Sequence, residues 1–182
     1  MKIGIIVGSL RRESFSRKIA ENVARLLPDG VTVEYIGIDL PMYNQDLDDD
    51  GTPPQSWTEF REAVKGCNAY LFVTPEYNRT IPPVIKNVLD IGSRPYGKNV
   101  WGGKKGAVIS VSPGTIGGFG ANHALRQAVV FLDITMLQQP EMYIGGVTKL
   151  LDKDGNVIES TKAFLRKFVT TFMEFTGGQK EE

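Results

Sequence analysis

A cluster of hydroxyl groups and one guanidinium follows the first apolar segment of the chain. Directly after Lys2–Val7 come three serines and an arginine: Ser9, Arg11, Ser14 and Ser16. Hydroxyl groups donate hydrogen bonds to phosphate oxygens, and a guanidinium can bind a phosphate through two parallel hydrogen bonds. A helix that begins here would add free N–H groups and the positive end of its dipole. The stretch therefore favours a phosphate monoester site; a serine helix cap beside exposed arginines is the purely structural alternative.

Two common phosphate-binding loops are excluded by pattern. The chain has no GxxxxGK[ST] motif, which excludes a P-loop NTPase, and no GxGxxG motif follows the first strand. An ordinary dinucleotide fingerprint is therefore missing as well.

Two further loops carry unusual residues at the ends of expected strands. One reads Pro75-Glu76-Tyr77-Asn78, and the other, residues 112–120, is rich in glycine and contains Ser112 and Gly114. The first of these could hold a planar heteroaromatic group by ring stacking and backbone hydrogen bonds, although a turn with a surface tyrosine fits it too. Glycines permit close approach of a ligand to the backbone. All three loops should lie at one edge of a parallel sheet, where ligands bind in open α/β folds.

The elements that would position these loops alternate along the chain. Apolar or β-branched runs predict strands at Lys2–Val7, 31–36, Ala69–Thr74, 106–111 and 134–138, with 141–144 as a candidate continuation of the last strand. Apolar residues at helical spacing predict helices at 16–27, 59–65, 82–92, 122–132 and 162–175. The acidic residues 40–54 read as an exposed connection. This order predicts an α/β protein with a flavodoxin-like three-layer sandwich and a five-stranded parallel sheet, forming one domain over residues 1–182.

Composition narrows the function classes. The 21 basic and 21 acidic residues cancel, which removes the electrostatic argument for nucleic-acid or anionic-membrane binding. No apolar run reaches the roughly 18 residues that span a bilayer, and no signal peptide is recognisable, so a cytoplasmic location is expected. The single cysteine, Cys67, reads as a small packing residue. The single histidine, His123, has no partners at metal-ligand spacing, so no metal site is expected.

Taken together, these motifs resemble the NAD(P)H-dependent FMN reductase family, especially its bacterial chromate and quinone reductases. The matching stretches are GSLRRESF, TPEYN, PPVIKNVLD and SPGTIGGFGANHALRQ, in that order along the chain. The resemblance implies a bound FMN, NADPH or NADH as co-substrate, and quinones and chromate as acceptors.

The resemblance also implies roles for individual residues. Five would contact the phosphate arm of FMN: Ser9, Arg11, Ser14, Phe15 and Ser16. Six would line the flavin ring or complete its pocket: Pro75, Glu76, Tyr77, Asn78, Ser112 and Gly114. Many relatives have asparagine where this chain has Ser16. Compared with asparagine, the serine keeps a side-chain oxygen but lacks the amide N–H donors. No side chain stands out as an obligatory acid or base.

Family members are commonly homodimers or homotetramers. In this chain, residues 82–90 follow the second loop and carry Val84, Ile85, Val88 and Leu89, more apolar surface than one sheet-facing stripe needs. We therefore expect part of this helix to pack against its counterpart in a twofold dimer.

Two other functions remain open at this stage. The chain could be a non-enzymatic electron carrier of the flavodoxin type, although such carriers tend to be strongly acidic and this chain is neutral. It could also be a nucleotide-sensing or partner-binding module that has kept the fold without catalysis. Oxidation of NAD(P)H with a quinone acceptor separates the enzyme from both.

Overall fold

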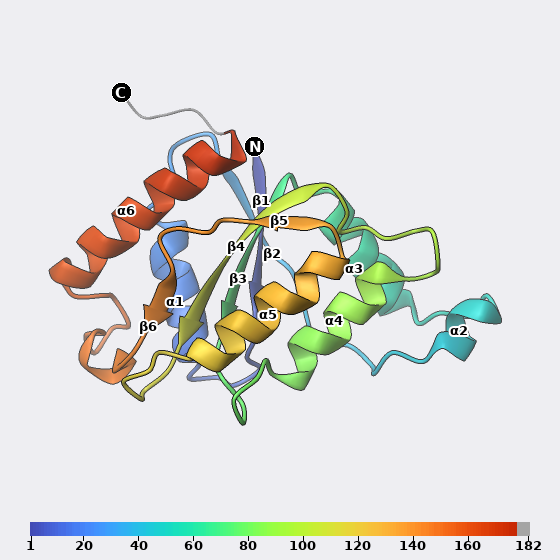
Figure 1. Ribbon diagram of the computed structural model, residues 1–182, viewed down its shortest axis with the longest axis horizontal. Helices are drawn as coiled ribbons and strands as arrows, with labels where there is room; N and C mark the ends of the chain where they lie inside the picture. The colour runs from blue at the N-terminus through green and yellow to red at the C-terminus, as the bar shows by residue number, and fades with distance from the viewer. Residues whose placement is uncertain (178–182) are drawn as a thin grey trace.

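The computed structural model describes residues 1–177 and is built around one parallel sheet (Figure 1). Its main strands are β1 (Lys2–Val7), β2 (Thr32–Tyr35), β3 (Ala69–Thr74), β4 (Lys104–Val111) and β5 (Ile134–Met136). They lie in the order β2-β1-β3-β4-β5, and every paired neighbour is parallel. The expected flavodoxin-like α/β fold is confirmed.

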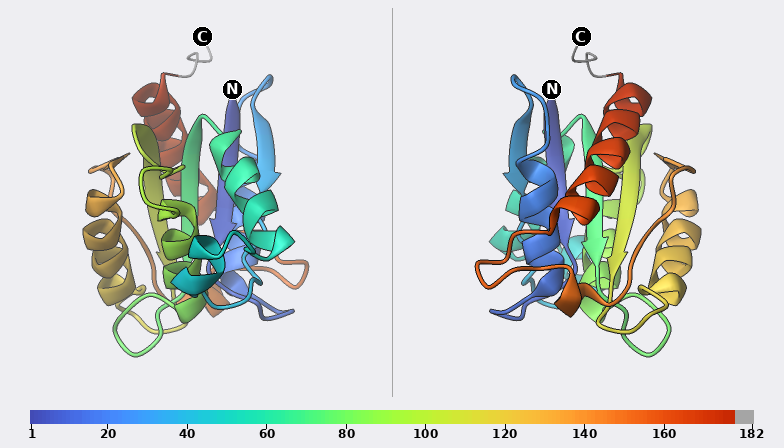
Figure 2. Two further views of the ribbon diagram at one scale, coloured as in Figure 1. Left: turned by 90° about the vertical axis from the view of Figure 1, so that its right-hand side faces the viewer. Right: turned by 90° about the vertical axis from the view of Figure 1, so that its left-hand side faces the viewer.

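Helices cover both faces of the sheet and give the fold its three layers (Figure 2). One face packs against α1 (Phe15–Ala24) and α6 (Glu159–Thr176), and the other against α3 (Gln55–Lys65), α4 (Pro83–Ser93) and α5 (Phe119–Phe131). Alternation along β1 divides its side chains between the two cores: Ile3 and Ile5 face the α1/α6 side, and Ile6 faces the other. β3 and the C-terminal part of β4 are buried throughout, as is β1 beyond Lys2, which explains their continuous apolar sequences.

The position of the fifth strand is shared by two short segments. β5 pairs with Lys104–Gly106 of β4, and β6 (Met142–Ile144) pairs with Ile109–Val111 further along the same strand. Residues 137–141 lie between them: Leu137 N still donates to the Gly106 carbonyl, and Pro140 has no N–H to donate. Both segments expected for the last strand are therefore present, as separate strands on the same side of β4.

The acidic connection contains an element that the sequence prediction lacked. A short helix, α2 (Gln45–Asp49), lies within residues 40–54, and its Asp48 is not solvated as expected. The Asp48 side chain is only 1% exposed and accepts hydrogen bonds from both terminal nitrogens of Arg61, at 2.9 and 2.7 Å. Arg61 Nε also donates to the Ile91 carbonyl, so this ion pair ties α2 to α3 and α4.

The apolar surface of α4 is used within the chain itself. Ile85, Val88 and Leu89 are buried in the core beneath α4, and only Val84 is partly exposed. The expectation that these four residues exceed what the sheet requires is therefore wrong. Large exposed apolar side chains lie instead at the end of α5, where Val130 is 75% and Phe131 is 90% exposed.

Helix α6 packs on the core through part of its aromatic side chains. Phe168 and Phe172 are buried with their rings stacked 5.9 Å apart, whereas Phe164 is 40% exposed. Within residues 1–177, no helix is long and apolar enough to cross a membrane.

Candidate functional site

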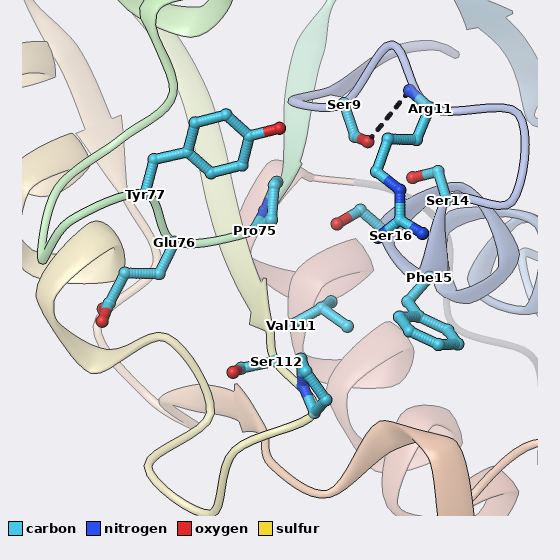
Figure 3. Close-up of a pocket in the computed structure, with 11 residues that line it drawn as sticks. Ser9, Arg11, Ser14, Phe15, Ser16, Pro75, Glu76, Tyr77, Val111 and Ser112 are labelled. Atoms are coloured by element: carbon cyan, nitrogen blue, oxygen red, sulfur yellow. Dashed lines mark hydrogen bonds between the residues drawn. The ribbon is translucent and has the colours of Figure 1, made fainter.

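A cleft opens where β1, β3 and β4 end, next to the point at which the strand order reverses between β1 and β3. It has a volume of about 160 Å³. Its lining comes from three loops: Ser9, Arg11, Ser14, Phe15, Ser16, Pro75, Glu76, Tyr77, Val111, Ser112 and Pro113. The three loops singled out in the sequence therefore do meet at one edge of the sheet (Figure 3).

The first loop forms the polar wall of the cleft. Ser14 is the N-cap of α1, and its hydroxyl accepts a hydrogen bond from Arg17 N at 3.1 Å. The next two amides, of Phe15 and Ser16, occupy the first helical positions and have no acceptor within the helix. Ser9 Oγ accepts from Arg11 N at 3.4 Å, and Figure 3 shows the Arg11 side chain extending toward Ser14 and Ser16.

Gly8 allows this loop to leave the sheet at a tight turn. A Cβ at Gly8 would lie 2.9 Å from both Ile85 Cγ1 and Thr74 Oγ1, closer than side chains pack. The loop is therefore held against β3 and α4, and its serines are presented at a fixed place.

The second loop ends in a tight turn that directs its side chains to different sides. Tyr77 and Thr80 exchange two backbone hydrogen bonds of 3.0 Å, and the residues between them, Asn78 and Arg79, have φ values of 48° and 67°. Positive φ at both central residues defines a type I′ turn. Pro75 and Tyr77 line the cleft, whereas Asn78 lies at the tip of the turn and is not among the lining residues.

Glu76 lines the cleft only in part, because its carboxylate points away from the first loop (Figure 3). Its Oε2 accepts a hydrogen bond of 3.0 Å from Ala121 N in the first turn of α5. That helix begins at Gly118, which has no capping side chain of its own, so Glu76 supplies the missing acceptor and a favourable charge at the helix N-terminus. The sequence analysis missed this role because the two partners are far apart in the chain.

The third loop is held by backbone hydrogen bonds to the end of β6 and to the residues that follow it. Ser112 N donates to the Ile144 carbonyl, and Gly146 N donates to the Gly114 carbonyl. Ser112 Oγ accepts from Gly114 N at 3.0 Å. Gly114 does not line the cleft, where Pro113 takes the adjacent position. Gly117, with a φ of 65°, packs so closely on Tyr143 that a Cβ would lie 2.8 Å from its backbone carbon.

The histidine lies outside the cleft lining, in a small aromatic cluster on α5. His123 Nε2 and the Tyr143 hydroxyl are 2.9 Å apart, and the Phe119 ring lies 4.2 Å from the His123 ring. Burial is the main cause that raises the pKa of Tyr143, and Glu141 raises it further. In the part of the chain that the structure describes, no group of three or more His, Cys, Asp or Glu side chains could hold a metal ion.

The donor set of the cleft fits a flavin mononucleotide. Ser14 and Ser16 are buried at the start of α1, and the free amides of that helix together with Arg11 are groups that would suit one phosphate. Pro75, Tyr77 and Ser112 line the cleft from the second and third loops, where a planar ring would lie. The cleft is smaller than the roughly 300–1,000 Å³ of pockets that enclose a whole ligand, so such a ring would remain open on one side.

The parallel sheet in the order β2-β1-β3-β4-β5, with helices on both faces, places the protein among the flavodoxin-like proteins. Residues 1–149 match the family model described as NADPH-dependent FMN reductase. The chain is 50% identical over 171 residues to a quinone reductase of Pseudomonas putida, covering 93% of this chain and 91% of that one. It is 42% identical over 175 residues to a 2-hydroxy-1,4-benzoquinone reductase of Burkholderia sp., covering 96% and 93%.

Structural similarity agrees with this assignment. FerB of Paracoccus denitrificans, described as a flavoenzyme NAD(P)H:(acceptor) oxidoreductase, superimposes with a TM-score of 0.90 at 36% identity, covering 97% of each chain. The protein therefore belongs to the NADPH-dependent FMN reductase family. It is an oxidoreductase of the flavoprotein type, which argues against the electron-carrier and binding-module alternatives.

Proposed function

We propose that this protein is an FMN-dependent NAD(P)H:quinone reductase. The observation that carries the proposal is the cleft at the sheet's switch point, which joins a phosphate site to a flat, partly open site in a chain half identical to a quinone reductase. When bound there, FMN supplies the capacity to accept a hydride from NAD(P)H and pass electrons to a quinone.

The roles of the site residues follow from the cleft wall on which each lies. Arg11, Ser14 and Ser16 would hold the phosphate, with Ser9 and Phe15 beside them. Pro75, Tyr77 and Ser112 would orient the ring. Glu76 would act on this wall indirectly, by fixing the loop to α5. We keep Asn78 and Gly114 as predicted contacts of the flavin, although neither residue lines the cleft.

The open side of the cleft fits the proposal that quinones are the electron acceptors. Tyr77 is 45% exposed at its edge, so hydride donor and acceptor can reach the same place in turn. Quinones are planar and can stack there, and the chromate anion is a second acceptor that we propose for testing. We place the enzyme in the cytoplasm, where reduced nicotinamide dinucleotides are available.

The experiment is to purify the protein, identify its flavin after denaturation, and measure NADPH and NADH oxidation with a quinone panel and with chromate. We expect FMN rather than FAD, because the cleft offers a site for one phosphate. We expect Arg11→Ala to weaken FMN binding roughly ten- to a hundredfold, the loss of one charge-assisted hydrogen bond. FAD as the main flavin, or no quinone turnover by the FMN-loaded protein, would overturn the proposal.

We also propose a homodimer or homotetramer, now supported by α5 rather than by the apolar residues of α4. Phe131 is 90% exposed and Val130 is 75% exposed, side by side at the end of that helix. Light scattering should show an oligomer for the native protein and smaller particles for Phe131→Glu. Because the Phe131 side chain contributes almost nothing to the core, the variant should still fold. A native monomer would contradict this part of the proposal.

A further inference from the structure

The type I′ turn of the second loop carries an arginine where that turn favours glycine. The central pair of such turns is commonly Asn-Gly, because both residues need positive φ. Here the pair is Asn78 and Arg79, and Arg79 has a φ of 67°. A non-glycine residue in this region costs free energy and is retained where the rest of the structure enforces it, commonly at functional sites.

The turn is held rigidly in place by α5. A Cβ at Gly120 would lie 2.5 Å from the Arg79 carbonyl oxygen, so the first turn of the helix packs directly on the backbone of the turn. The two hydrogen bonds between Tyr77 and Thr80 close it on the other side. Arg79 is therefore presented from a fixed backbone, two residues beyond Tyr77, which lines the cleft.

The charge of Arg79 is hardly used within the fold. Its side chain is 76% exposed, and its one ion pair is to Glu76 Oε1 at 3.9 Å, the limit of such a contact. At this distance, and with Arg79 largely in solvent, the pair contributes little to stability, although the Glu76 side chain itself is only 16% exposed. The Glu76 carboxylate is already engaged by Ala121 N through its other oxygen. The exposed guanidinium can therefore also bind an anion that approaches the turn from solvent.

We propose that Arg79 determines co-substrate affinity by binding a phosphate group of the nicotinamide dinucleotide. This inference rests on the proposed function. The first loop would hold the FMN phosphate at one end of the cleft, and the flavin ring would lie toward Pro75 and Tyr77. A hydride donor stacked on that ring must extend its phosphates outward past the rim. Arg79 follows the cleft-lining Tyr77 by two residues in the same tight turn, and a guanidinium suits phosphate by charge and shape.

The test compares Arg79→Gly and Arg79→Lys with the native holoprotein. Glycine removes the charge and also relieves the positive φ, so the melting temperature should stay unchanged or rise, and the FMN content should be unaltered. The Kd values for NADP⁺ and NAD⁺, measured by calorimetry without turnover, and KM for NADPH and NADH give independent readouts. We expect Arg79→Gly to raise Kd and KM about tenfold or more with little change in kcat. The Kd and KM values of Arg79→Lys should lie between those of the native protein and those of Arg79→Gly.

The pattern across the two dinucleotides identifies the phosphate. A loss confined to NADP⁺ and NADPH assigns the contact to the 2′-phosphate, and an equal loss for both pairs assigns it to the shared pyrophosphate. About 1 M salt should narrow the gap between Arg79→Gly and the native protein, because charges are screened within about 3 Å. Arg166→Ala, which removes an exposed charge on α6, should leave Kd and KM unchanged.

Two results would overturn the inference. Unchanged Kd and KM for both dinucleotides in Arg79→Gly would show that the guanidinium does not contact the co-substrate. A fall in melting temperature or FMN content matching the loss of affinity would show that Arg79 is structural. Either outcome leaves the proposed function standing, because native turnover is measured separately. Conversely, native protein that binds NADP⁺ but reduces no quinone would refute the function and not the contact.

Discussion

Replacing Asp48 by asparagine should destabilise the protein strongly, although the residue lies in an acidic surface segment. The Asp48 side chain is 1% exposed and that of Arg61 is 10% exposed, so the carboxylate neutralises a nearly buried guanidinium. Asparagine keeps the shape but removes the charge. Breaking a buried pair on one side costs about 3–5 kcal/mol, because the remaining charge stays buried without a partner.

This free energy corresponds to a large thermal shift. A protein of this size loses about 2–4 °C in melting temperature per kcal/mol, so Asp48→Asn should lower the melting temperature by about 6–20 °C. Calorimetry at one fixed FMN concentration measures it, since bound flavin itself adds stability. Asp49→Asn is the matched control, because Asp49 is the exposed neighbour in the same helix and should change the unfolding free energy by less than about 0.5 kcal/mol.

A double variant tests the cause of the effect. In Asp48→Asn/Arg61→Met the guanidinium is removed together with its partner, so much of the lost stability should return despite the lost hydrogen bond to the Ile91 carbonyl. If Asp48→Asn and Asp49→Asn melt at the same temperature, or if the double variant is no more stable than Asp48→Asn, the buried-charge reasoning is refuted.

Two further predictions concern Glu76 and Cys67. Glu76→Ala should destabilise the protein by about 0.5–2 kcal/mol, because alanine removes the acceptor for Ala121 N. Glu76→Gln should destabilise it by less, because glutamine keeps an acceptor oxygen. Equal unfolding curves for Glu76→Ala and the native protein would contradict this capping role. Burial is the main cause that raises the pKa of the Cys67 thiol, so the folded state keeps this proton to higher pH than the unfolded state does. The native protein should therefore lose more stability than Cys67→Ala as pH rises above the ordinary thiol pKa, measured by guanidinium unfolding; parallel losses would show that the thiol does not contribute.

The sequence predicted the elements whose signals are local. The continuous apolar runs of β1 and β3 are visible in the chain, and loops that follow parallel strands must meet at one edge of the sheet. This is why the cleft-forming loops could be named before the structure was known. The exact ends of helices were harder, since α3 begins at Gln55 rather than at residue 59.

What the sequence did not predict depends on partners distant along the chain. Asp48 looks like any residue of an acidic loop until Arg61 is placed beside it, and the direction of Glu76 depends on an amide in α5. In the sequence, the apolar residues of α4 outnumber those of one helix face. In the structure they share a buried cluster with Trp101, which packs on Tyr70, and such contacts cannot be read from local periodicity.

The divided fifth strand has a consequence for how copies of this protein can associate. A sheet edge with a long row of unpaired N–H and C=O groups invites another strand to add to it, which leads to aggregation. Here one edge is β2, with four residues, and the other is split into β5 and β6, with three residues each and Pro140 between them. Neither edge offers a long, regular ladder for an incoming strand. An ordered assembly would then have to use the helical faces, where the contacts are made by side chains and are specific to the sequence.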